Sequence, residues 1–135
     1  MDIRENFDNI KREISEACGK VDRSPEDIKV IAVTKYVTDA RVEQAIEAGV
    51  DSFAENRPQD YLERKQKYSD KEWHLIGSLQ TRKVRDVINH VDYFHALDRE
   101  SLAKEIEKRA EDKVNCFVQV NVSGEESKHG LTSHE

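Results

Sequence analysis

Short apolar stretches alternate with amphipathic stretches along the whole chain. The apolar stretches are rich in β-branched residues, which predicts strands at 29–35, 52–56, 72–77, 93–98 and 115–122. The amphipathic stretches predict helices at 39–48, 58–68, 80–90 and 99–112, and apolar residues at helical spacing predict an opening helix over 3–17. Thr38 stands where a helix N-cap is expected, and Gly49 stands where a helix-terminating glycine is expected.

The residues that end the predicted strands recur at a nearly constant spacing. Lys35, Asn56, Gly77 and Asp98 follow one another at intervals of 21 residues, and Asn121 follows after 23. One strand and one helix per interval predict consecutive right-handed βα units in a parallel α/β sheet. We interpret them as the first five units of a (β/α) barrel of the TIM type rather than an open doubly wound sheet. No Gly-rich phosphate loop follows the first predicted strand, and barrels gather strand-end polar residues on one face.

The length of the chain fits part of such a barrel. We expect residues 1–135 to form a single domain, whereas a complete barrel normally takes at least about 200 residues. The chain is therefore expected to be the N-terminal part of a longer barrel. In a polypeptide that stopped at Glu135, the first and fifth strands would lack neighbours, and self-association through these open edges is expected.

Composition narrows the classes of partner. Charged residues make up 37% of the chain and the net charge is −6, without a long basic run, which argues against nucleic acid as the main partner. No apolar stretch approaches the roughly 18 residues of a membrane span, and the first residues do not resemble a signal peptide, so a cytoplasmic protein is expected. Cys18 and Cys116 lie far apart without a C-x-x-C spacing, which favours reduced buried thiols over a disulfide or a metal site.

Lys35 is the first candidate for chemistry, because it follows the apolar run 30–34. At the end of a strand buried on both faces, desolvation would lower the pKa of the lysine amine. A partly neutral amine is a nucleophile that can form a Schiff base with an aldehyde. A strand-end lysine that simply reaches solvent is the alternative.

Four further residues are candidates for binding a ligand. Asn56 either caps the following helix or faces a ligand, and Glu55 is expected on the opposite side of the strand. His74 is either a hydrogen-bonded core histidine or a ligand contact. Asn121 ends the fifth predicted strand, and Lys128 in the polar loop beyond it is a second candidate amine or a solvated loop lysine.

Five segments together resemble the pyridoxal-phosphate homeostasis family, small proteins that bind pyridoxal 5'-phosphate (PLP). They stand in the family's order and cover almost the whole chain: 32–35, 53–59, 73–80, 119–121 and 128–130. The resemblance implies a PLP-carrying barrel similar to the N-terminal domain of alanine racemase, with Lys35 as the Schiff-base lysine. The cofactor-binding candidates are then Lys35, Asn56, His74, Asn121 and Lys128. In the family, loops that hold the phosphate come from later strands, beyond Glu135.

The resemblance is compatible with two functions, a non-catalytic carrier and an enzyme. We expect a non-catalytic carrier that holds PLP as a lysine aldimine and controls intracellular PLP. The alternative is a PLP-dependent enzyme similar to an amino-acid racemase. Racemases of this fold need a second acid–base group opposite the lysine, usually a tyrosine from a further β-rich domain, and 135 residues do not accommodate such a domain. A third reading, a βα scaffold that binds nothing, predicts unchanged ligand behaviour in Lys35→Ala.

Overall fold

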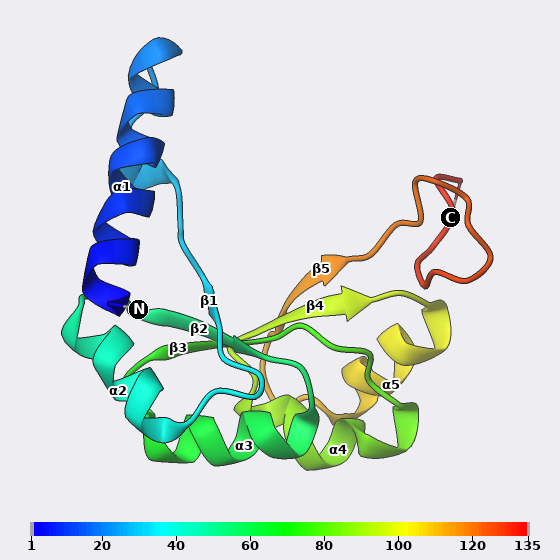
Figure 1. Cartoon of the computed structure of the whole chain (residues 1–135). Helices are drawn as coiled ribbons and strands as arrows, with labels where there is room; N and C mark the ends of the chain where they lie inside the picture. Colours follow the sequence, from blue (N-terminus) through cyan, green and yellow to red (C-terminus); the bar gives the residue numbers. More distant parts are fainter. Residues whose placement is uncertain (1, 135) are drawn as a thin grey trace. The chain divides into compact units, whose positions relative to one another are not determined.

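The computed structural model describes residues 2–134, in which strands and helices alternate along the chain (Figure 1). By their internal contacts the residues divide into two compact units, Met1–Phe53 and Ala54–Glu135. The boundary falls inside the second strand. We describe each unit by itself.

The first unit begins with the predicted opening helix, α1 (Ile3–Lys20), which the Asp2 side chain caps by accepting a hydrogen bond from the Arg4 N–H at 3.0 Å. The remaining elements are the 3-10 turn η1 (Pro25–Asp27), the strand β1 (Ala32–Val33), the helix α2 (Asp39–Glu47) and the start of β2 (Ser52–Glu55). Thr38 caps α2 as predicted, since its Oγ1 accepts from the Arg41 N–H at 3.3 Å. Gly49 follows α2 with a φ of +104°, which glycine adopts without steric cost.

The first predicted strand is much shorter than the sequence suggested. Only Ala32–Val33 of residues 29–35 form a strand, and Val33 is 49% exposed. The expectation of a strand buried on both faces is therefore wrong. β-Branched residues favour an extended backbone, but a strand also needs a neighbouring ladder and packing on its faces, which the local sequence does not encode.

The second unit contains a parallel sheet with the order β2-β3-β4-β5. Its further strands are β3 (Glu72–Leu75) and β4 (Tyr93–Leu97), close to the predicted ranges, and β5 (Asn115–Val118). The prediction that the fifth strand extends over 115–122 is wrong at its end, because β5 stops at Val118 and Asn121 lies in the loop beyond it. In the β3–β4 pair His74 lies opposite Tyr93, and in the β4–β5 pair Tyr93 lies opposite Asn115. This alignment sets which side chains meet across the sheet.

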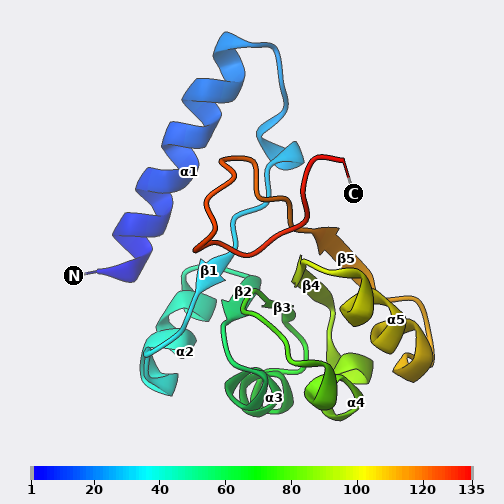
Figure 2. The same cartoon turned by 90° about the vertical axis from the view of Figure 1, so that its right-hand side faces the viewer.

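Helices connect these strands and lie together on one face of the sheet, seen from two sides in Figures 1 and 2. They are α3 (Pro58–Lys67), α4 (Val84–Val87) and α5 (Glu100–Arg109). The helix predicted at 80–90 is instead split into η2 (Thr81–Lys83), α4 and η3 (Ile88–His90). At Val87 the φ of −124° departs from helical geometry, while its side chain is fully buried, so packing overrides the local helical pattern.

The core of the second unit lies between the sheet and these helices. Alternate strand residues are fully or almost fully buried there: Trp73, Leu75, Phe94 and Ala96. The Tyr61 hydroxyl from α3 lies 3.0 Å from the His90 carbonyl oxygen and accepts from the Asp92 N–H at 3.0 Å. Burial raises the pKa of Tyr61 above its ordinary value, so the hydroxyl stays protonated. The opposite strand residues form what we call the inner face of the sheet.

Both cysteines are free thiols; Cys18 is buried and Cys116 is half-buried, and burial raises the pKa of the Cys116 thiol. None of the helices within residues 2–134 has both the length and the apolar character that a membrane crossing requires.

Candidate functional site

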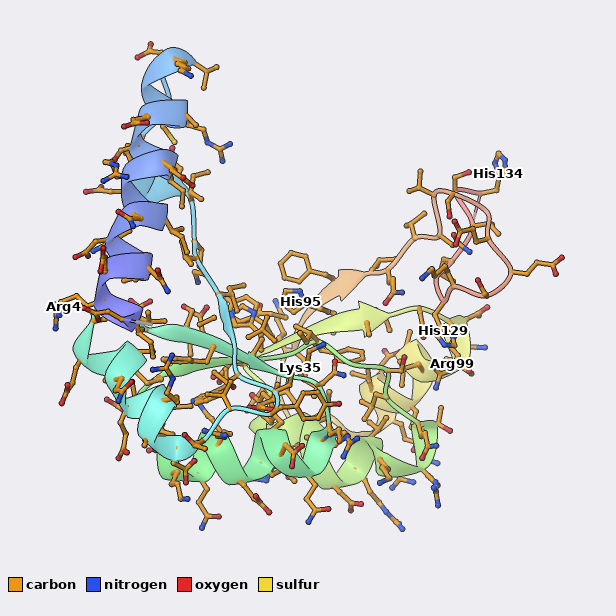
Figure 3. All side chains as sticks on the ribbon, in the orientation of Figure 1. Arg4, Lys35, His95, Arg99, His129 and His134 are labelled. Atoms are coloured by element: carbon orange, nitrogen blue, oxygen red, sulfur yellow. The ribbon has the colours of Figure 1, made fainter. Side chains whose placement is uncertain are left out.

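Lys35 lies in a tight turn immediately after β1. The Val37 N–H donates to the Thr34 carbonyl oxygen at 3.1 Å, so Lys35 and Tyr36 are the two central residues of the turn. Thr34 is buried, whereas Lys35 is exposed; its side chain is labelled in Figure 3. The expectation of a buried lysine amine is therefore wrong, because β1 ends at Val33 and the turn directs the next residues to the surface.

The residue after Lys35 has an unusual backbone. Tyr36 has a φ of +64°, in the left-handed region that residues with a side chain seldom adopt. Its side chain is 87% exposed, so burial of the ring does not account for this conformation. Such conformations cost on the order of 1–3 kcal/mol and cluster at functional sites. The strained turn supports a functional interpretation of the adjacent Lys35.

Asn56 lies at the carboxyl end of β2, in the second unit. The N-cap of α3 is Arg57, without a side-chain cap hydrogen bond, so the interpretation of Asn56 as the cap is wrong. Glu55 is 2% exposed, and its carboxylate lies 3.6 Å from Nε of Arg64 on α3. Glu55 therefore points to the helix side of β2, and Asn56 directly follows the strand.

The end of β3 packs against the backbone of Asn56. The Ile76 N–H donates to the Glu55 carbonyl oxygen at 3.0 Å, which brings the two strand ends together. A Cβ at Gly77 would lie 2.0 Å from the Asn56 carbonyl oxygen and 3.0 Å from its Oδ1. Gly77 is thus required for the close approach of these two segments of the chain, because any larger residue would collide with the backbone of Asn56.

His74 is buried on the inner face, and both of its ring nitrogens have a side-chain partner. Nε2 lies 2.7 Å from a carboxylate oxygen of Glu72, and Nδ1 lies 2.7 Å from Nε2 of His95. The His74 ring also stacks on Tyr93, with the ring centroids 4.5 Å apart. These contacts match the alternative of a hydrogen-bonded core histidine. A direct cofactor contact by His74 would require one of these hydrogen bonds to be exchanged.

His95 is a functional candidate that the sequence reasoning missed. It lies on β4, on the inner face, and its ring stacks on Phe117 of β5 at a centroid distance of 4.6 Å. The signal was present in the sequence, since His74 and His95 are 21 residues apart, the same interval that separates the strand ends. Equal spacing places both imidazoles at equivalent positions of neighbouring βα units.

Asn121 organises the loop that follows β5. Its Nδ2 donates to the carbonyl oxygens of Glu125 at 2.7 Å and Lys128 at 3.4 Å. Its Oδ1 accepts from the Ser123 hydroxyl at 3.2 Å and the Gly124 N–H at 3.1 Å. The side chain is therefore engaged with its own loop, and its role in the described residues is to position that loop.

Lys128 lies in this loop with an exposed side chain, and its N–H donates to the Glu125 carbonyl oxygen at 3.1 Å. Gly130 closes the loop with a φ of +135°, and a Cβ there would lie 2.7 Å from the Asn121 backbone nitrogen. The structure thus brings Asn121 and Lys128 together in one loop. Lys35 belongs to the first unit, whereas Asn56, His74, Asn121 and Lys128 belong to the second.

We predict that Asn121→Asp loosens this loop. A carboxylate would place an oxygen, in place of the donating amide, against the carbonyl oxygens of Glu125 and Lys128. The lost hydrogen bonds are expected to lower the free energy of local opening of the loop by about 1 kcal/mol. This change corresponds to roughly fivefold faster trypsin cleavage after Lys128. The matched control is Asn89→Asp, because Nδ2 of Asn89 likewise donates to a carbonyl oxygen, that of Arg109 at 3.2 Å. Equal cleavage after Lys128 in both variants would contradict a positioning role for Asn121.

Comparison with known protein families matches residues 3–135 to the family described as "Alanine racemase, N-terminal domain". Curated relatives include the pyridoxal phosphate homeostasis protein of Haemophilus influenzae, 35% identical over 142 residues, with all of this chain and 60% of the relative covered. The protein of the same name from Escherichia coli is 35% identical over 138 residues, with 96% of this chain and 59% of the relative covered. The chain therefore spans about 60% of the length of these relatives.

Solved structures agree with the family match. A protein from Bifidobacterium adolescentis superposes with a TM-score of 0.85 at 29% identity, covering 96% of this chain and 59% of that one. PipY of Synechococcus elongatus with PLP bound superposes with a TM-score of 0.65 at 28% identity, covering 81% of this chain and 54% of that one. The predicted fold class is confirmed: the chain supplies the first five βα units of a parallel (β/α) barrel.

Proposed function

Because the chain belongs to the alanine racemase N-terminal-domain family, we propose that it binds PLP and serves PLP homeostasis. The observation that carries the proposal is similarity along essentially the whole chain to proteins named for PLP homeostasis. A structural relative, PipY, has been solved with PLP bound. The proposal concerns the whole protein, of which these residues form the N-terminal part of the barrel.

Within this proposal Lys35 is the residue that attaches the cofactor. PLP supplies an aldehyde that reacts with primary amines and a ring that withdraws electrons. The residues present fit this chemistry, since a lysine amine stands at the end of β1 on a strained and exposed turn. Exposure gives the amine access to a cofactor that arrives from solvent. Within the second unit, Asn56 and the Asn121 loop are proposed as cofactor-binding elements, and Lys128 is proposed to offer a second amine from that loop.

We further propose that the protein does not turn over amino acids. Turnover on PLP needs a base placed to remove the α-proton and an acid placed to return it, in addition to the attached cofactor. The curated relatives are named as homeostasis proteins. The second candidate, a racemase-like enzyme, is favoured only by the family name shared with alanine racemase.

Two measurements on the full chain test these proposals. Addition of PLP is expected to produce an absorbance band at about 420 nm that survives extensive dialysis. Incubation of alanine with the loaded protein in deuterated water is expected to leave its α-hydrogen unexchanged, as followed by proton NMR. A PLP spectrum unchanged by the protein would contradict binding, and α-hydrogen exchange that requires Lys35 would establish the racemase-like alternative.

A further inference from the structure

A series of short hydrogen bonds crosses the inner face of the second unit. It runs from Glu72 through His74 to His95, with 2.7 Å between Glu72 Oε1 and His74 Nε2 and 2.7 Å between His74 Nδ1 and His95 Nε2. The side chain of His74 is 2% exposed and that of Glu72 is 29% exposed. A nearly inaccessible imidazole thus links a carboxylate that reaches solvent to a second imidazole, which is labelled in Figure 3.

The chemistry of the three groups sets the direction of each hydrogen bond. A carboxylate can only accept, so Nε2 of His74 carries the hydrogen that faces Glu72. In a neutral His74 ring Nδ1 is then an acceptor, and the hydrogen between the rings belongs to Nε2 of His95. Nδ1 of His95 is left as an acceptor, and within residues 2–134 the structure records no hydrogen-bond partner for it.

The surroundings of His95 disfavour a positive charge on its ring. Burial is the first cause that lowers the pKa of His95 below its ordinary value, and the second is repulsion between the two imidazoles when His74 is protonated. The side chains stacked on the two rings are Tyr93 from β4 and Phe117 from β5. The carboxylate that is hydrogen-bonded to the series is that of Glu72, on Nε2 of His74.

The Glu72 end of the series lies in a polar cavity of about 530 Å³ at the amino ends of β3, β4 and β5. Its lining contains Glu72 and five further charged residues: Lys65, Asp70, Lys71, Asp92 and Lys113. Within it the ammonium of Lys65 lies 2.8 Å from a carboxylate oxygen of Asp92. Water and buffer reach Glu72 here, which gives the series an exit for a proton.

We propose that Glu72, His74 and His95 form a proton relay between the inner face of the sheet and this polar cavity. A donor on the inner face protonates Nδ1 of His95, and His95 passes its Nε2 hydrogen to Nδ1 of His74. His74 then passes its Nε2 hydrogen to Glu72, which releases it to water in the cavity. At each imidazole one N–H bond forms and one breaks, so the charge moves while each ring ends neutral.

The relay does not depend on the proposed function. Every atom in it belongs to the second unit, and the relay requires no cofactor. Its role in PLP chemistry would be to supply or remove protons at the inner face. A failure of PLP binding would leave the relay intact, and a failure of the relay would leave PLP binding intact.

The test is NMR of the ¹⁵N-labelled full chain without cofactor. Long-range ¹H–¹⁵N correlations at neutral pH are expected to show hydrogen on Nε2 of both His74 and His95, with Nδ1 of His95 unprotonated. In Glu72→Gln the exchange of the His95 Nε2 hydrogen with water is expected to slow by about tenfold or more, because the acid–base group at the exit is lost. This slowing is specific to proton transfer, since a purely structural loss would speed exchange.

The matched control is Glu126→Gln, which removes one carboxylate from the exposed loop and is expected to leave His95 exchange unchanged. Hydrogen on Nδ1 of His95 in the unmodified protein would overturn the relay. Equal or faster exchange in Glu72→Gln than in Glu126→Gln would also overturn it. If Glu72→Gln does not fold, the protonation pattern of the unmodified protein decides alone.

Discussion

Replacement of Lys35 by alanine is expected to abolish covalent attachment of PLP to the full chain. Alanine removes the amine that can form an imine with the cofactor aldehyde at this turn, so the pyridoxyl label fixed by borohydride at residue 35 should disappear, and PLP affinity should fall by about tenfold or more. Peptide mapping after borohydride reduction measures the first effect, and absorbance at about 420 nm after dialysis measures the second.

Two control variants separate nucleophilicity from charge and from general lysine reactivity. Lys35→Arg keeps the positive charge, but a guanidinium remains protonated and is not expected to attach the cofactor. Lys108→Ala removes an exposed lysine on α5 and is expected to leave labelling of Lys35 unchanged. A label confined to Lys65 or Lys108 in the unmodified protein would refute the assignment of Lys35.

Gly77→Ala is expected to destabilise the second unit strongly. The added Cβ would lie 2.0 Å from the Asn56 carbonyl oxygen, a backbone atom that cannot rotate away. The ends of β2 and β3 must therefore separate, which strains the hydrogen bond from Ile76 to Glu55. Overpacking of this kind costs about 3 kcal/mol. Urea unfolding followed by fluorescence of the single, buried Trp73 measures the loss where it occurs.

Gly19→Ala is the matched control for Gly77→Ala. Gly19 lies within α1, and a Cβ there has no other atom within 4 Å. Alanine in a helix is favoured over glycine by about 0.5–1 kcal/mol, so this variant should be neutral or slightly more stable. Similar destabilisation by both variants would show that the close approach at Gly77 has no special cost.

Displacement of Asn56 by Gly77→Ala also affects the proposed cofactor site. Because Asn56 directly follows β2 and its carbonyl oxygen and Oδ1 are the atoms nearest to the added Cβ, it moves when the strand ends separate. Gly77→Ala protein that remains folded is therefore expected to show weaker PLP binding, whereas Gly19→Ala is not. This comparison connects the geometry of the strand ends to the proposed function.

Local sequence determined the order of the elements and several of their ends. The 21-residue interval between strand ends corresponds to one βα unit, and three of the later strands match their predicted ranges to within a few residues. Thr38 and Gly49 were placed correctly because capping and left-handed backbone depend on one or two neighbouring residues. The five segments that resemble the PLP homeostasis family identified the family for the same reason, since motifs are local.

Tertiary structure decided which of those residues are buried and which contact one another. Lys35 has the sequence context of a buried strand end, yet β1 is two residues long and the lysine is exposed in a strained turn. Asn56 resembles a helix cap, yet Arg57 occupies that position. The pairing of His74 with His95 follows from the alignment of β3 with β4. Burial and contacts between distant residues depend on packing between elements, and a pattern within one element does not contain that information.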